Sequence, residues 1–180
     1  MLKRVSRLST LNSDILYGFT CGDEWMDDWV SRKAPRQLSH GLCVMHVGLD
    51  EHDVPVGFFT LANCQIGASD ISRRERHGFQ RTPFGALLIG EIAVRADLRH
   101  SDYHYGVRLL NHAVKIACDL SLDSGIGFIV VDPRDGNDRL CRWYQSNGFV
   151  CTPEGFRHYM PIRVARERVA KLGDEYFVFD

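Results

Sequence analysis

The stretch that decides the fold lies at positions 137–149 and reads N-D-R-L-C-R-W-Y-Q-S-N-G-F. It predicts a helix over about 138–146 that ends at Gly148, because glycine favours the backbone of a helix C-terminus. Upstream, the short β-branched run I-G-F-I-V-V at positions 126–131 predicts a buried strand that ends at Asp132. A buried strand followed by a loop, a helix and another strand indicates an α/β domain.

The preceding part of the chain also alternates strands and helices. Acidic residues at its start and basic residues at its end predict a helix over 22–34, which Pro35 should terminate. Two apolar runs joined by a short polar turn predict a β-hairpin. A longer apolar run then predicts a central strand, and apolar residues at helical spacing predict an amphipathic helix after it. The predicted positions are 42–49 and 54–62 for the hairpin, 86–94 for the central strand and 106–121 for the helix.

Length, composition and charge limit the class of protein. A chain of 180 residues with 44% hydrophobic content can bury its core as one domain. No apolar run is long enough to span a membrane and the N-terminus lacks a secretory signal, so we expect a cytoplasmic protein. The net charge of −1 gives no overall electrostatic case for nucleic acid, and any such case depends on local clusters.

The cysteines are scattered through apolar contexts without the spacing of metal-binding pairs. We therefore expect reduced packing thiols, with neither disulfides nor a metal site. The six are Cys21, Cys43, Cys64, Cys118, Cys141 and Cys151.

Over roughly residues 5–162 the chain resembles the GCN5-related N-acetyltransferase (GNAT) superfamily. The matching pieces are the strand ending I92-A-V94, the segment G106-V-R-L-L110, and Asn137, Tyr144, Gly148 and Phe149. The resemblance implies a mixed, mostly antiparallel twisted sheet with splayed central parallel strands, flanked by helices. It places an acetyltransferase domain at 1–162. Residues 163–180 form an extension, helical and then apolar, which we expect to pack on this domain or on a partner subunit.

The resemblance also implies a site for acetyl-CoA. In the family the pantetheine bonds to the backbone of the first splayed strand, here Ile92, Ala93 and Val94. The pyrophosphate lies at the start of the next helix, where exposed amides and the helix dipole favour an anion. The family loop Arg/Gln-x-x-Gly-x-Gly/Ala corresponds to R99-H-S-D-Y-H-Y-G106, in which His104 replaces the first glycine. The residues assigned to the cofactor in this segment are Arg99, His104, Tyr105, Gly106, Val107 and Arg108. The alternative is a solvated loop before an ordinary helix start.

Acetyl transfer needs an acid for the departing thiolate, and the resemblance assigns this role to Tyr144. A phenol is a competent donor to a thiolate, whereas the alternative is a tyrosine that packs on the sheet beside Trp143. Asn137 would bond the pantetheine amides, and it can also serve as a helix N-cap. For the base, Asp132 and Glu91 are candidates, and each has a structural alternative in a turn or an ion pair. An α-amine needs little activation in any case, because its pKa lies near 7.7.

Local clusters and the opening segment bear on the acceptor. The segment F19-T-C-G-D-E-W-M-D-D-W29 resembles the start of toxins that acetylate the amino acid on charged tRNA. Arg73, Arg74 and Arg76, with Arg81, form a basic cluster suited to phosphates, although such a run is often only a solvated face. We therefore expect a toxin acting on aminoacyl-tRNA, with a small antitoxin and a homodimeric state. The alternatives are acetylation of a protein or small-molecule amine, and a non-catalytic acyl-CoA-binding or interaction protein with a degenerate phosphate loop.

Overall fold

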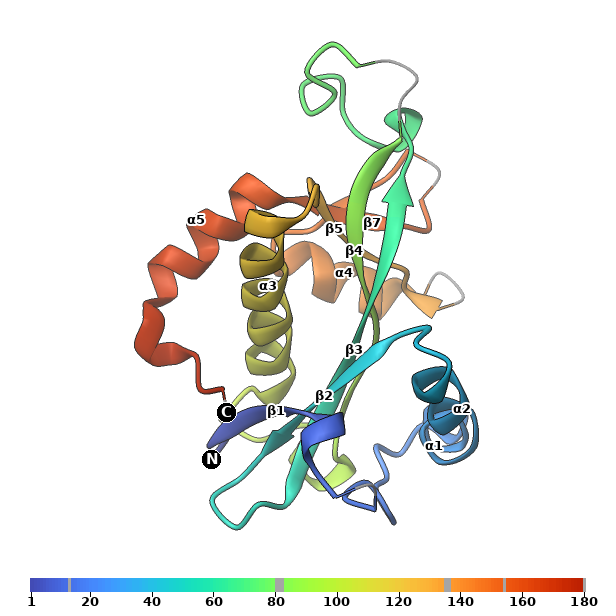
Figure 1. Ribbon diagram of the computed structural model, residues 1–180, viewed down its shortest axis with the longest axis vertical. Coiled ribbons are helices and arrows are strands. Elements are labelled where there is room, and N and C mark those ends of the chain that lie inside the picture. Colours follow the sequence, from blue (N-terminus) through green and yellow to red (C-terminus); the bar gives the residue numbers. More distant parts are fainter. Residues whose placement is uncertain (13, 80–82, 135–136, 154, 180) are drawn as a thin grey trace. The chain divides into compact units, whose positions relative to one another are not determined.

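The computed structural model describes the chain except for residues 13, 80–82, 135–136, 154 and 180. Its strands are β1 (Arg4–Arg7), β2 (Val44–Leu49), β3 (Pro55–Ile66), β4 (Phe84–Val94), β5 (Phe128–Val131), β6 (Val150–Cys151) and β7 (His158–Pro161). Its α-helices are α1 (Glu24–Asp28), α2 (Ala34–Ser39), α3 (Tyr105–Asp123), α4 (Asp138–Ser146) and α5 (Ile162–Leu172). In the described part of the chain the strands form a seven-stranded sheet in the order β1-β2-β3-β4-β5-β7-β6. The predicted mixed α/β class is confirmed (Figure 1).

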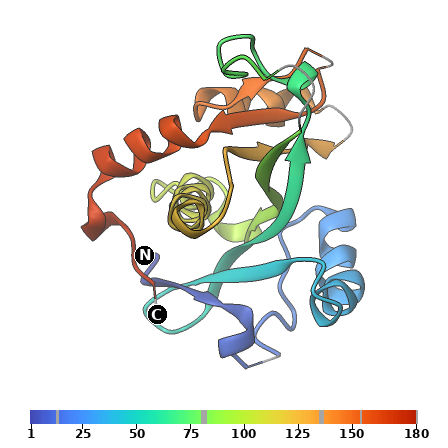
Figure 2. The ribbon, with the colours of Figure 1, turned by 45° about the horizontal axis from the view of Figure 1, so that its top comes forward.

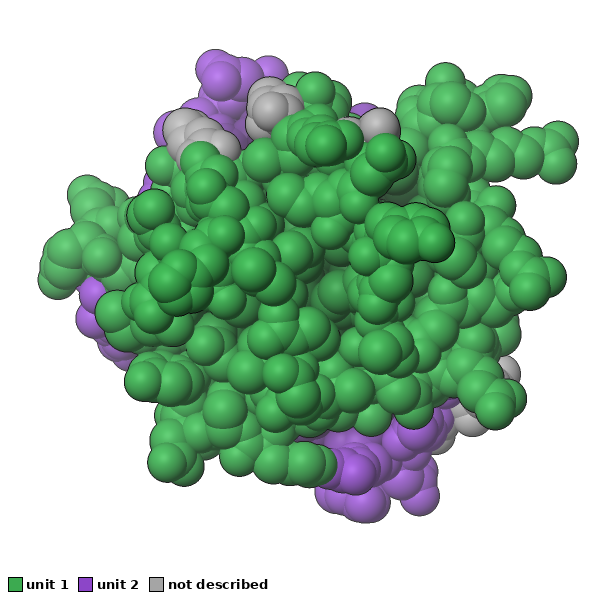
Figure 3. Space-filling view, turned by 90° about the horizontal axis from the view of Figure 1, so that it is seen from below, with its two compact units in different colours: residues 1–62, 91–113, 173–180 green, residues 63–90, 114–172 purple. Residues whose placement is uncertain are grey.

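The chain divides into two compact units, which Figure 3 colours separately and which we describe in turn. Unit 1 comprises Met1–Ala62, Glu91–Ala113 and Gly173–Asp180, and unit 2 comprises Asn63–Gly90 and Val114–Leu172. The elements β3, β4 and α3 each contribute residues to both units.

In unit 1, β2 pairs antiparallel with both β1 and β3. The predicted end of the first helix at Pro35 is wrong. After α1 the chain makes a π-helical stretch, Trp29–Lys33, and continues directly into α2, where Pro35 occupies the first turn. A first-turn proline loses no hydrogen bond, because that amide has no acceptor within the helix. The buried face of this helical region joins a core of Cys21, Trp29, Val30, Ala34, Met45, Val47, Leu49, Phe58 and Ala93.

The two ends of the chain meet in unit 1. Phe179 forms a parallel bridge with Val5 of β1, and the Val5 amide donates to the Val178 carbonyl at 2.7 Å. Figures 1 and 2 both show the C-terminal segment, in red, returning beside the N-terminal strand. The last residues therefore extend the edge of the sheet beyond β1.

In unit 2, β4 and β5 are parallel, and their pairing runs from Ala86 with Phe128 to Ile89 with Val131. β5 ends at that last pair, whereas β4 continues to Val94. β7 pairs antiparallel with β5 and β6. The core of this unit contains Ile66, Ile71, Ala86, Phe128, Val130 and Tyr159.

The helix over 138–146 forms with the predicted bounds. Gly148 follows it with a φ of +85°, a conformation that glycine adopts without a steric penalty. The six cysteines are free. None of the helices in the described part of the chain is long and apolar enough to cross a membrane.

Candidate active site

The start of α3, in unit 1, is the segment that the sequence assigns to the pyrophosphate. The His104 carbonyl accepts hydrogen bonds from the amides of Val107 at 3.0 Å and Arg108 at 3.1 Å, so helical bonding begins at this residue. His104 itself has a φ of +48°. This is the left-handed region, which glycine occupies freely and which histidine tolerates better than most side chains. At the position that the resemblance aligns with the family's first glycine, His104 therefore has a backbone conformation that glycine adopts freely.

The arginines assigned to the phosphates lie in this same unit. Arg99 follows a 3₁₀ turn over Ala96–Leu98, and its guanidinium lies near Gly22, where Nη1 would be 4.0 Å from an added Cβ. Arg108 is half-buried in the first turn of α3. Tyr105 is buried, and burial raises the pKa of its hydroxyl, so the phenol stays protonated.

The last residues of β4, Glu91 to Val94, lie in close contact with the neighbouring strand β3. A Cβ added to Gly57 would lie 2.3 Å from the Ala93 carbonyl oxygen, so only glycine fits there without movement. The Glu91 amide donates to the Thr60 hydroxyl at 2.9 Å. The half-buried Glu91 carboxylate acts electrostatically on Cys43, whose thiol pKa is raised first by burial and then by this charge. The backbone assigned to the pantetheine is thus held firmly from one side.

In unit 2, Asn137 is the N-cap of α4. Its Oδ1 accepts hydrogen bonds from the amides of Arg139 at 3.0 Å and Leu140 at 3.2 Å. The N-cap role predicted as an alternative for Asn137 is therefore confirmed for its side-chain oxygen. The side-chain amino group forms no hydrogen bond to the described residues. A cap and a ligand contact therefore use different atoms of the same side chain.

Tyr144 lies on α4 and is only 3% exposed. Its ring makes edge-to-face contacts with Trp143 at 4.9 Å and with Phe149 at 5.6 Å between centroids. Such contacts fix the plane of the ring. The packing alternative for Tyr144 is therefore real, and it does not exclude a role for the hydroxyl.

Asp132, at the end of β5, forms a bidentate ion pair with Arg157. Nε donates to Oδ1 at 2.7 Å and Nη2 donates to Oδ2 at 2.6 Å, while Nη1 donates to the Gln65 carbonyl at 3.2 Å. This pair raises the pKa of Arg157. A proton transferred from the acceptor amine to Asp132 would compete with the Arg157 guanidinium for the same carboxylate oxygens. Sequence reasoning missed Arg157, because only the pairing of β5 with β7 brings it to Asp132.

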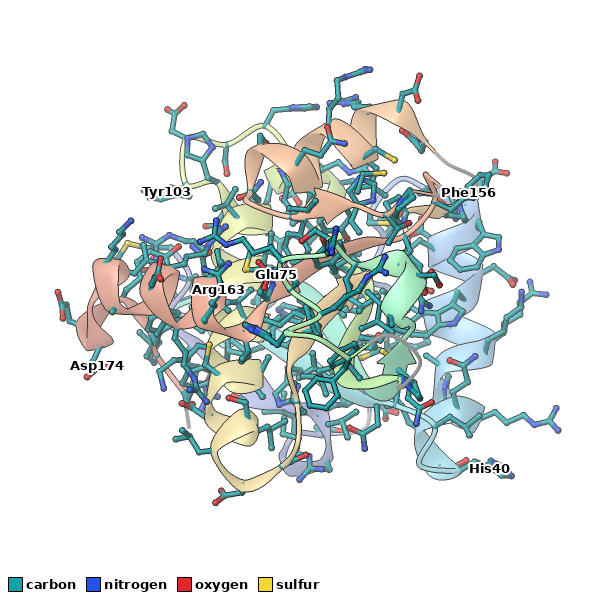
Figure 4. The ribbon with its side chains drawn as sticks, turned by 90° about the horizontal axis from the view of Figure 1, so that it is seen from above. His40, Glu75, Tyr103, Phe156, Arg163 and Asp174 are labelled. Carbon is teal, nitrogen blue, oxygen red and sulfur yellow. The ribbon has the colours of Figure 1, made fainter. Side chains whose placement is uncertain are left out.

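The basic cluster lies on a loop of unit 2 that an ion pair anchors. Glu75 is 9% exposed and accepts from Arg163 Nη2 at 2.6 Å, and Figure 4 shows these two side chains meeting. Arg76 donates from Nε to the Ile71 carbonyl at 3.2 Å, so it serves the loop itself. Arg73 and Arg74 are exposed. Arg81, also predicted for this cluster, lies outside the described residues.

The predicted site residues divide between the two units. Unit 1 holds the cofactor set of β4 and α3 together with Glu91, and unit 2 holds Tyr144, Asn137, Asp132 and the arginine loop. Among the described residues, no group of three or more histidine, cysteine, aspartate and glutamate side chains is arranged to hold a metal.

Comparison with known proteins supports the fold. The sequence matches no protein-family model. The structure resembles a tyrosine-to-phenylalanine mutant of KacT with a TM-score of 0.81 at 14% identity, covering 93% of this chain and 99% of that one. It resembles AtaT complexed with acetyl-methionyl-tRNAfMet with a TM-score of 0.80 at 17% identity, covering 91% and 97%. A mutant AtaT toxin bound to the C-terminus of the antitoxin AtaR and acetyl-CoA gives 0.73 at 17% identity, covering 93% and 98%. The chain therefore shares the fold of these proteins, a GNAT-like mixed α/β fold.

Proposed function

We propose that the protein is an acetyl-CoA-dependent N-acetyltransferase that modifies the amino group of aminoacyl-tRNA. The observation that carries the proposal is the start of α3, where His104 keeps a left-handed backbone at the position of the family's glycine. A side chain at positive φ costs free energy, so its retention here favours a functional loop over an ordinary helix start. Two structures with this fold contain acetyl-CoA, which agrees with that assignment.

The residues of unit 1 bind the donor. Exposed amides at the start of α3 and the charges of Arg99 and Arg108 hold the pyrophosphate, since anions are favoured at a helix N-terminus. The backbone from Ile92 to Val94 bonds the pantetheine. Because Gly57 allows β3 to approach this strand closely, the carbonyls of the strand are fixed before the ligand arrives.

The residues of unit 2 carry the proton chemistry. The acceptor nitrogen attacks the thioester carbon, the new C–N bond forms, and the C–S bond breaks as the thiolate takes a proton from Tyr144. The acceptor amine loses its own proton to water or to a carboxylate. Asp132 is already engaged in its ion pair with Arg157. A strong base is not required, however, because an α-amine has a pKa of about 7.7.

An aminoacyl-tRNA acceptor is supported by two features. A structure with the same fold was solved with acetyl-methionyl-tRNAfMet. In this chain, Arg73 and Arg74 are exposed on a loop that Glu75 and Arg163 anchor, and arginines on such a support suit RNA phosphates. A structure with this fold was solved with the C-terminus of an antitoxin, and we therefore propose a small antitoxin as partner. We also propose that the protein is a homodimer.

The proposal is tested with labelled acetyl-CoA and total charged tRNA. Replacing Tyr144 with Phe keeps the ring contacts and removes the proton, so turnover should fall about 100-fold while the affinity for acetyl-CoA changes little. Tyr17→Phe is the matched control, because Tyr17 is 95% exposed, and it should behave as the parent. Equal turnover in the parent and Tyr144→Phe would show that Tyr144 only packs.

A second candidate function is acetylation of a protein or small-molecule amine. The balanced charge of the chain favours it, because a net charge of −1 gives no broad electrostatic attraction to RNA. Peptides with free N-termini and polyamines, offered beside charged tRNA, separate the two functions. If the parent shows no rise in melting temperature with millimolar acetyl-CoA, both enzyme proposals fail and the interaction-protein alternative stands.

A further inference from the structure

The C-terminal segment Gly173–Phe179 packs on the first turns of α3, within unit 1. Tyr176 ends a 3₁₀ turn, and its hydroxyl accepts a hydrogen bond from Asn111 Nδ2 at 3.0 Å. Two residues further on, the Val178 amide donates to His112 Nε2 at 3.3 Å. Asn111 and His112 are both almost fully buried, at 3% and 0% exposed. The segment is therefore tied to the helix by buried polar groups and not merely by apolar contact.

His112 links this segment to Arg108 through the helix backbone. Its Nδ1 lies 2.7 Å from the Arg108 carbonyl oxygen, which can only accept, so Nδ1 carries the proton and Nε2 is the acceptor for Val178. The imidazole ring also meets the rings of Phe177 and Phe179 edge-on, at 5.5 and 5.2 Å between centroids. The contacts require one neutral tautomer of His112, and that tautomer holds the segment in register with the helix.

The contact between Tyr176 and Arg108 bears directly on the proposed donor site. The guanidinium carbon of Arg108 lies 5.2 Å from the centre of the Tyr176 ring, within the range of a cation–π contact. Such a contact involves the face of the tyrosine ring and uses no oxygen or nitrogen acceptor for the guanidinium N–H groups. Within the described part of the chain, no acceptor bonds those N–H groups.

From this geometry we infer that the C-terminal segment is a positioning element for Arg108, with Tyr176 orienting the guanidinium toward the phosphates of acetyl-CoA. The inference rests on the proposed function, because it takes the start of α3 as the phosphate site. A free arginine side chain must be ordered when it binds a phosphate, and this ordering opposes binding. Tyr176 orders the guanidinium in advance.

A double-mutant cycle tests the inference. Acetyl-CoA binding is measured by calorimetry for the parent, Tyr176→Leu, Arg108→Leu and the double variant. Loss of a cation–π contact at a half-exposed position predicts about twofold to fivefold weaker binding for Tyr176→Leu. In the Arg108→Leu background, the same change should have no further effect, because Tyr176 acts through Arg108. Tyr176→Phe keeps the ring and should bind nearly as the parent does.

Acetyl-pantetheine, which lacks the nucleotide and its phosphates, is the second probe. Its affinity should be the same for the parent and Tyr176→Leu. An equal loss with both probes would mean that Tyr176 only supports the fold, and it would overturn the inference, as would unchanged acetyl-CoA binding by Tyr176→Leu. If the parent binds neither probe, the proposed function fails and the inference falls with it. If the parent binds acetyl-CoA and Tyr176→Leu binds it equally well, the inference is overturned but the proposed function is not.

Discussion

Replacing Gly57 with Ala should damage both stability and donor binding. The new Cβ would lie 2.3 Å from the Ala93 carbonyl oxygen and 2.7 Å from Leu109 Cδ1. Since carbon and oxygen atoms normally approach to about 3.3 Å, one of the two strands must move by roughly 1 Å. Overpacking of this kind costs about 1–3 kcal/mol. The gain of about 0.4–1 kcal/mol from a less flexible unfolded chain does not offset it.

For a chain of 180 residues, a net loss of about 1–2 kcal/mol lowers the melting temperature by about 2–8 °C. Because Ala93 belongs to the backbone assigned to pantetheine, the affinity for acetyl-CoA should fall as well. The free energy of unfolding is measured in urea, and binding is measured by calorimetry at a temperature where the variant is folded. Gly127→Ala is the matched control, since its nearest neighbour, the Gly85 oxygen, would be at an ordinary 3.8 Å. A Gly57→Ala protein with parental stability and affinity would refute this reasoning.

Two further predictions concern titration and the ion pair at the end of β5. Burial lowers the pKa of His112, so its neutral form stabilises the fold above the unfolded pKa of about 6.5, and this contribution is lost as the pH falls through the folded value. The charge facing the ring is that of Arg108, which opposes protonation. Among the described residues, the groups that contact the ring from the C-terminal side are Tyr176, two phenylalanine rings and the Val178 amide. His112→Gln should flatten the loss of unfolding free energy between pH 7.5 and 5, and an unchanged slope would contradict this. Arg157→Lys should cost less than about 1 kcal/mol in urea unfolding because the pair with an aspartate is partly exposed, and a loss of several kcal/mol would contradict that estimate.

The sequence by itself determined the elements whose signals are local. The helix α4 has the predicted bounds, because its cap, its apolar spacing and the glycine after it all lie within one short stretch. The apolar runs of the central strand and of α3 likewise gave elements within about two residues of their observed ends. The same local reasoning failed at Pro35. A proline forbids only a particular hydrogen bond, and the π-helical stretch before α2 places it where no bond is lost.

Tertiary structure decided everything that depends on distant residues. The engagement of Asp132 by Arg157 requires β5 and β7 to be neighbours, and the close approach at Gly57 requires β4 to lie against β3. The sequence showed His104 only as a departure from the family's glycine, whereas the structure shows that its backbone has a positive φ, which glycine adopts freely. The C-terminal segment looked only apolar, yet buried bonds tie it to α3. Periodicity encodes which face of an element is buried, but not which residues far along the chain will meet that face.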